Sequence, residues 1–136
     1  MKYILSLILI MLSYNIFSSP NDIEIGFKNL KLVGNLKRIN KKDGDYKKSN
    51  CQNWNFKDAT LKNLLKKMQL VSSSDWNLLC YTYPCSYEGV VENESIRYKI
   101  IVNGASHIKL IGEKETLYFI NRKKSIIFIT PCNCCE

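Results

Sequence analysis

The sequence predicts an α+β domain in which an antiparallel β-meander of about five or six strands packs against one amphipathic helix, stapled by disulfides. Three observations predict it. From residue 76 onward, short runs of alternating apolar and polar residues are separated by polar turns. Between residues 58 and 68 the apolar period changes to that of a helix. Six cysteines, an even number, all lie after residue 50, which is typical of a disulfide framework.

The strands are expected in a series of short segments with two-residue periodicity. Alternation over residues 23–39 predicts one or two strands, and later strands are expected at residues 76–81, 87–92, 96–102, 107–111, 117–120 and 125–130. Asn103-Gly104 is a strong signal for a two-residue hairpin turn. The apolar residues of segments 96–102 and 107–111 fall on one face. Residues 126–129 are apolar on both faces, so that strand is expected to be central or covered on both sides.

The helix is expected to begin at Asp58 and to end at Ser72-Ser73-Ser74. Leu61, Leu64, Leu65 and Met68 are spaced so that they share one face. Asp58 is the expected N-cap, because its side-chain oxygen can accept a backbone N–H and its charge suits the helix N-terminus.

The N-terminal segment predicts export. Met1-Lys2 is basic, residues 3–17 are mostly apolar, and Ser18 precedes a polar chain, which is the pattern of a secretory signal peptide. We therefore expect a signal peptide at 1–18, a single domain at 19–136, and a periplasmic or secreted protein with no stable membrane insertion after cleavage. An uncleaved N-terminal anchor is the alternative, although the apolar run is short for a membrane span.

All six cysteines are expected to form disulfides in an oxidising compartment: Cys51, Cys80, Cys85, Cys132, Cys134 and Cys135. Several pairings remain open. Cys80 and Cys85 bracket a short loop with Pro84 and could pair with each other, or Cys51 could reach the C-terminal group and tie the domain's start to its end. The adjacent Cys134 and Cys135 are expected to have different partners, because a ring between neighbours is strained.

The charge of the chain is concentrated near its start. The net charge is +8, and residues 28–48 hold eight basic and two acidic side chains. Such a segment attracts anionic partners, and its candidate contacts for an acidic protein are Lys37, Arg38, Lys41 and Lys42. The alternative is a solvated lysine-rich loop. Nucleic acid is not expected as a partner, because stacking motifs are lacking.

The sequence contains no convincing catalytic set, and we expect no catalytic, metal or cofactor residues. Ser106 and His107, the one histidine, are neighbours in a predicted strand and point to opposite faces. Glu92 and Glu94 fall in a predicted turn, with Glu88 nearby, and nothing suggests the apolar pocket that a general acid needs. The tail lacks the paired Cys-x-x-Cys of structural zinc sites, and no glycine-rich phosphate loop is present.

Aromatic residues cluster around the segment from Cys80 to Cys85. Tyr81, Tyr83 and Tyr87 are the candidate partner contacts there, with Trp76 nearby. Tyrosine and tryptophan are enriched at binding hot spots, and a disulfide-held loop would be pre-organised. The alternative is that these rings cover a small core.

The run Trp54-Asn55-Phe56-Lys57-Asp58, the amphipathic helix, the segment from Ser74 to Tyr81 and the step Cys85-x-x-Glu88-Gly89 resemble small exported bacterial proteins. Those proteins are regarded as immunity proteins that neutralise antibacterial effectors in the cell envelope. The resemblance covers residues 54–119, does not extend to the cysteine-rich tail, and assigns no functional residue. It implies a partner-blocking role. The alternatives are a small secreted hydrolase or toxin using Glu88 or His107, and an envelope adhesin or structural protein.

Overall fold

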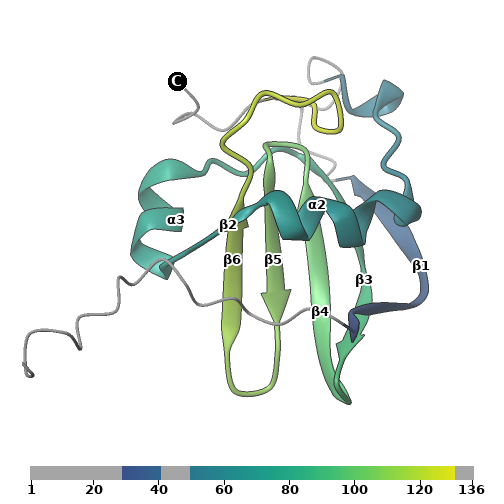
Figure 1. The fold of residues 1–136 in the computed structure, drawn as a ribbon. Coiled ribbons are helices and arrows are strands. Elements are labelled where there is room, and N and C mark those ends of the chain that lie inside the picture. Colours follow the sequence, from purple (N-terminus) through teal and green to yellow (C-terminus); the bar gives the residue numbers. More distant parts are fainter. Residues whose placement is uncertain (1–28, 41–49, 131–136) are drawn as a thin grey trace, which may run out of the picture.

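The computed structural model describes residues 29–40 and 50–130. The predicted signal peptide, Lys41, Lys42, Cys132, Cys134 and Cys135 lie outside the described residues. The described chain forms a six-stranded sheet in the order β1-β3-β4-β5-β6-β2, with every pairing antiparallel (Figure 1). The strands are β1 (Lys31–Asn40), β2 (Gln69–Val71), β3 (Cys85–Asn93), β4 (Ile96–Asn103), β5 (His107–Ile111) and β6 (Thr116–Ile120).

The predicted meander is confirmed by β3 to β6, which follow one another in the chain and pair in sequence. Glu94 and Ser95, with φ of 49° and 71°, close the first hairpin as the two residues between strands. The second hairpin differs from the expected two-residue Asn-Gly turn. Asn103 pairs with His107, so three residues form the connection, and Ser106 has the positive φ of 65°. The extra residue leaves Asn103 at the end of β4, where its side chain bonds the backbone of Tyr83.

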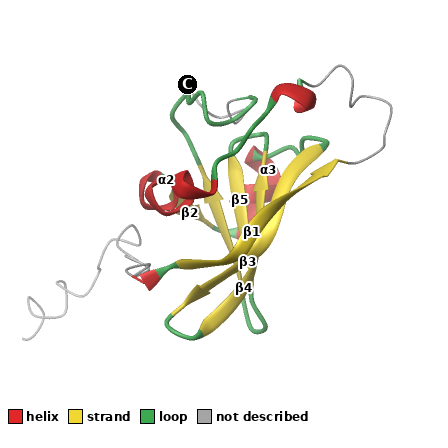
Figure 2. Ribbon diagram, turned by 90° about the vertical axis from the view of Figure 1, so that its right-hand side faces the viewer, coloured by secondary structure: helices red, strands yellow, loops and turns green. Residues whose placement is uncertain are grey.

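The predicted helix face is confirmed. A 3-10 turn at Asp58–Thr60 leads into α2 (Leu61–Lys67), and α2 lies across one face of the sheet (Figures 1 and 2). The four predicted apolar residues of this segment are all buried: Leu61, Leu64, Leu65 and Met68. They pack with Trp54 and Phe56 over the buried side chains of β3 to β6. Burying such a side chain contributes about 1.5–3 kcal/mol, so this face supplies much of the core.

Asp58 does not cap α2 as predicted. The N-cap of α2 is Thr60, which makes no side-chain capping bond. Because the first turn tightens into a 3-10 turn, Asp58 lies one turn too early, and its Oδ2 accepts the backbone N–H of Leu36 at 3.4 Å instead. Its carboxylate therefore connects the start of the helix segment to β1.

The predicted strand at residues 76–81 is wrong, because this segment forms a second helix, α3 (Ser73–Leu79). The serine run begins this helix rather than ending the first one. Ser72 Oγ accepts the N–H of Asp75 at 3.0 Å, which is the geometry of an N-cap. Trp76 then packs on the sheet face opposite α2, with ring centroids 5.3 Å from His107 and 5.2 Å from Tyr118.

The predicted strand at residues 125–130 is also wrong. These residues form turns and bends, because the free side of β6 is taken by β2, the short strand that the periodicity did not reveal. Their backbone groups find other partners: Ile129 and Thr130 both donate to Gly104 O, and Ile127 O accepts Trp54 Nε1–H at 2.8 Å. Phe128 is buried in the core while Ile126 is fully exposed.

One disulfide joins Cys51 to Cys85, two positions that are 34 apart in sequence. This pairing overturns both sequence-based alternatives, in which Cys85 paired with Cys80 or Cys51 paired with the C-terminal group. Both bonded cysteines are completely buried, and Cys80 directly follows α3 in a half-buried position. In the part of the chain described, neither helix is long and apolar enough to cross a membrane.

Candidate functional site

The residues between α3 and β3, numbers 80–84, form a loop that we call the tyrosine loop. The side chain of Asn103, which is only 2% exposed, makes hydrogen bonds to the backbone of this loop. Its Oδ1 accepts the N–H groups of Tyr83 and Ala105, and its Nδ2 donates to Tyr83 O, each at 3.0 Å. One buried amide thus satisfies both backbone groups of Tyr83, and the loop is fixed to the end of β4.

A second set of hydrogen bonds fixes Tyr81. His107 Nε2 lies 3.1 Å from Tyr81 O, and since a carbonyl can only accept, Nε2 carries the proton and donates. The hydroxyl of Tyr81 lies 2.7 Å from Thr130 Oγ1. Ser106 Oγ donates to Thr130 O in turn. The loop, the β4–β5 turn and the segment before residue 131 are therefore connected at one end of the sheet.

The two predicted tyrosine contacts differ in exposure. Tyr81 is 38% exposed, whereas Tyr83 is half-buried and lies close to Gly104. Their rings meet edge to face with centroids 6.0 Å apart. Leu78, at the end of α3, exposes 83% of its surface a few residues earlier in the chain. The tyrosine loop therefore presents an aromatic surface on a backbone that side-chain hydrogen bonds hold in place, and Leu78 precedes it on α3.

The third predicted contact, Tyr87, lies in the core rather than at the surface. It is 8% exposed, its hydroxyl donates to Trp54 O at 3.2 Å, and its ring centroid lies 5.0 Å from that of Trp54. Tyr87 faces inward because its partner in β4 is the buried Val102, and paired residues of neighbouring strands point to the same face. For Tyr87, the alternative that the aromatic rings cover a small core is therefore the correct one.

The described basic candidates are divided between the two faces of β1. Lys37 is exposed and pairs with Glu88 of β3. Arg38 points to the other face and is half-buried, where its Nε donates to Asn40 Oδ1 and its Nη1 to Gln52 O, both at 3.3 Å. Arg38 thus anchors the turn before α2, and Lys37 is the one of the two that is available to a partner.

Most of the side chains considered for catalysis have structural partners. Glu88 forms an ion pair with Lys99 at 2.8 Å and Glu92 one with Arg97 at 3.0 Å. Burial lowers the pKa of His107 to about 4; the carbonyl of Tyr81 opposes this shift and the charge of Lys109 adds to it. At neutral pH the imidazole is therefore uncharged, and its donor is committed to the tyrosine loop.

The depressed pKa of His107 makes stability depend on pH. The unfolded chain binds a proton to this histidine below pH 6.5, but the folded chain does so only below about 4. The contribution of the neutral His107 to the free energy of unfolding is therefore present above pH 6.5, and about 3 kcal/mol of it is lost as the pH falls to 4. We expect urea unfolding to show this loss in the wild type and a smaller one in His107→Gln, which removes the titrating group. An NMR-titrated imidazole pKa of 6 or above would contradict the expectation.

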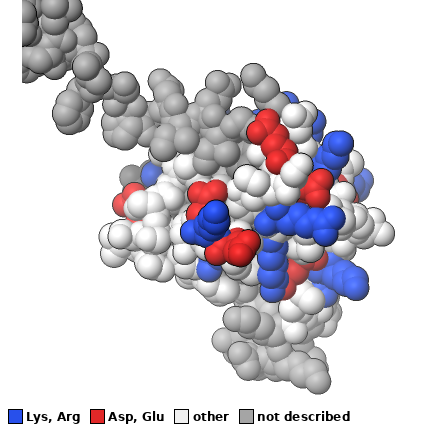
Figure 3. Space-filling model, turned by 90° about the horizontal axis from the view of Figure 1, so that it is seen from below, with Lys and Arg blue, Asp and Glu red and all other residues white. Residues whose placement is uncertain are grey.

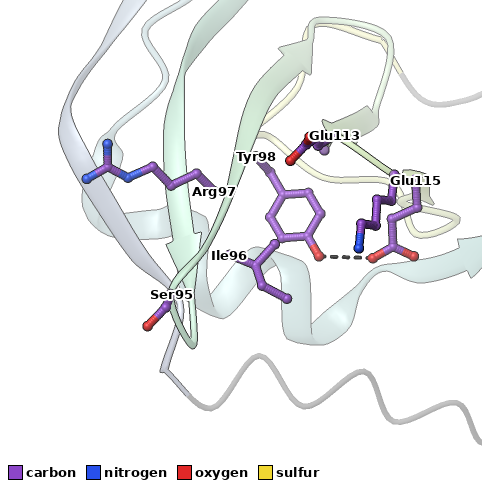
Figure 4. A pocket seen from close by; sticks show the side chains of 8 residues that line it. Ser95, Ile96, Arg97, Tyr98, Glu113 and Glu115 are labelled. Atoms are coloured by element: carbon purple, nitrogen blue, oxygen red, sulfur yellow. Dashed lines mark hydrogen bonds between the residues drawn. The ribbon is translucent and has the colours of Figure 1, made fainter.

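A cleft of about 490 Å³ lies at the opposite end of the sheet, between the β3–β4 and β5–β6 turns (Figure 4). Tyr98 forms its inner wall and donates its hydroxyl to Glu115 Oε1 at 3.0 Å. Burial, followed by this bond and the carboxylate charge, raises the pKa of Tyr98. Lysine and arginine side chains alternate with acidic ones around this end (Figure 3), so no single charge dominates the cleft.

Among the residues described, no three His, Cys, Asp or Glu side chains come together in a way that could hold a metal ion. The fold and its fixed loop define a disulfide-bonded α+β domain built on an antiparallel meander. Comparison with known protein families, curated proteins and solved structures found no match for the chain.

The sequence indicated Tyr81 and Tyr83 but missed the residues that hold them, Asn103 and Thr130. A signal for Asn103 was present. The asparagine of an Asn-Gly hairpin usually lies in the turn itself. A turn that begins one residue later, at Gly104, would have placed Asn103 at the end of β4, where its side chain can reach the tyrosine loop.

Proposed function

We propose that this protein is exported and acts by binding a protein, as an immunity protein that blocks an antibacterial effector in the periplasm. The observation that carries the proposal is the tyrosine loop, in which Asn103 fixes the backbone of Tyr83 while Tyr81 remains 38% exposed. A loop that is already ordered loses little conformational entropy on binding. Less of the binding free energy of its aromatic contacts is therefore offset by the cost of ordering the loop.

Binding is favoured over catalysis because the histidine and two of the glutamates considered for catalysis are buried or held in ion pairs. A general base must have a free lone pair near a substrate. His107 is 3% exposed, and the sheet and Trp76 surround its ring. Glu88 and Glu92 are engaged in ion pairs with neighbouring strands. The buried disulfide is the kind of feature that forms in an oxidising compartment, which supports export.

The test begins by capturing the partner on purified wild-type protein from an envelope extract, and then purifying that partner for calorimetry. We expect Tyr81→Ala to weaken binding at least tenfold, because truncating an aromatic hot spot costs about 2 kcal/mol or more. Ile96→Ala is the control, since Ile96 is 55% exposed at the opposite end of the sheet.

Two results would contradict the proposal. Retention of glycans or lipids with no stoichiometric protein would favour the adhesin alternative. Equal affinity of Tyr81→Ala and Ile96→Ala for the captured protein would show that the tyrosine loop is not the contact.

A further inference from the structure

The sheet face opposite α2 is only partly covered by α3, which lies over β5 and β6 through Trp76. On β1, β3, β4 and the end of β5, this face carries apolar side chains at the surface. Val33, Val90 and Ile111 are 43%, 38% and 36% exposed, and Ile101 is half-buried among them. We call the surface of these four residues the open face.

The strand register makes the open face continuous. Val33 pairs with Val90, which pairs with Lys99, which pairs with Ile111. Ile101 lies in the adjacent row, diagonal to both Val90 and Ile111. All four apolar residues are β-branched, so each has few rotamers to lose on binding. Contiguous exposed apolar residues on a rigid sheet are typical of an interaction surface, whereas isolated ones are not.

The charges around the open face are unbalanced. The two acidic side chains beside it on β3, Glu88 and Glu92, are already paired with Lys99 and Arg97. Lys31 and Lys37, in β1 beside them, are exposed and form no ion pair within residues 29–40 and 50–130. Lys109 lies in the same row as Lys37, with its ammonium 4.1 Å from the Trp76 ring centroid. A partner must therefore supply carboxylates around an apolar centre.

A second copy of the chain does not meet this requirement. Two open faces, or two β1 edges, would bring Lys31, Lys37 and the other basic residues of one copy against those of the other, and like charges in contact are unfavourable. The bulge between Val33 and Lys37, where Gly34 has a φ of 79°, also interrupts the β1 edge as a template for pairing.

We infer that the open face is a second contact surface for the protein partner, and that it binds an acidic region with apolar side chains at its centre. The inference rests on the proposed function, because it names a surface and a partner chemistry for the same binding role. The tyrosine loop supplies aromatic contacts at one end of the sheet. The open face supplies the charge complementarity that selects the partner and speeds its association.

The test uses photo-crosslinking amino acids in the full chain, expressed in the source cells. One variant carries the crosslinker at Val90, one at Tyr81, and a control carries it at Lys62, which is exposed on α2. We expect the same protein to be captured from positions 90 and 81 but not from position 62. The captured protein is then purified, and its affinity is measured for wild type and for Lys31→Glu/Lys37→Glu.

We expect the double charge reversal on β1 to weaken binding about tenfold to a hundredfold and to slow association, with the difference shrinking as salt rises. Lys62→Glu/Lys66→Glu makes the same charge change on the exposed side of α2 and should leave affinity unchanged. Capture at Tyr81 but not at Val90, or equal affinities of the two double variants, would overturn the open face while leaving the proposed function standing. Capture from neither position would overturn both.

Discussion

Removing the Cys51–Cys85 bridge should cost about 4 kcal/mol of unfolding free energy. The bridge joins positions 34 apart in sequence, and the chain-entropy model gives this value for a loop of about that length. Both cysteines are completely buried, so Cys51→Ala/Cys85→Ala also loses packing. Urea unfolding of the double variant and of the wild type, both without reductant, measures the difference.

Lys62→Ala serves as the control, because an exposed substitution of this kind changes stability by about 0.5 kcal/mol or less. A loss below about 1 kcal/mol in the double cysteine variant would mean that the bridge does not restrict the unfolded chain as the model assumes. The packed core of the meander would then carry the stability of the domain without it.

Asn103→Ala should destabilise the domain by about 3 kcal/mol and weaken partner binding more than tenfold. The substitution removes the partner of the buried N–H of Ala105 and of both partly buried backbone groups of Tyr83, and a fully buried unsatisfied group costs about 1–3 kcal/mol. It also releases the tyrosine loop, so ordering that loop becomes a cost of binding. Urea unfolding and calorimetry with the purified partner measure the two effects.

Asn63→Ala is the matched control, because Asn63 is exposed on α2 and the same atoms are removed. Its stability and affinity should match those of the wild type. If Asn103→Ala destabilised the domain yet bound the partner normally, the fixed loop backbone would have no part in recognition.

The meander was predictable because its strands satisfy a strong local rule. In β4 and β5 the alternation of apolar and polar residues matches the burial of the side chains, from Tyr98, Ile100 and Val102 to Ile108 and Leu110. The helical period of residues 61–68 likewise specified which face of α2 is buried. Periodicity reports burial directly, and burial stabilises these elements.

The errors arose where tertiary contacts decide between local alternatives. Ser72 to Ser74 can either end a helix or cap one, and packing of Trp76 on His107 and Tyr118 favours the second. Residues 125–130 have strand-like composition, but β2 occupies the edge where they could have paired. Tyr87 is buried because its strand register pairs it with Val102, and its place in an aromatic cluster of the sequence does not reveal that register. The pairing of Cys51 with Cys85 depends on where the segment before α2 packs, which has no local signal.

The order of the strands has a consequence for how the chain acquires its structure. β3 to β6 are joined by short turns and need little chain closure to pair, whereas β1 and β2 reach the outer strands of the sheet across longer separations. Pairing with low loop-closure entropy forms fastest. We therefore expect the central four strands to pair first and the two flanking strands to join a sheet that already exists. Strands that come later in the chain therefore organise β1 and β2, which precede them.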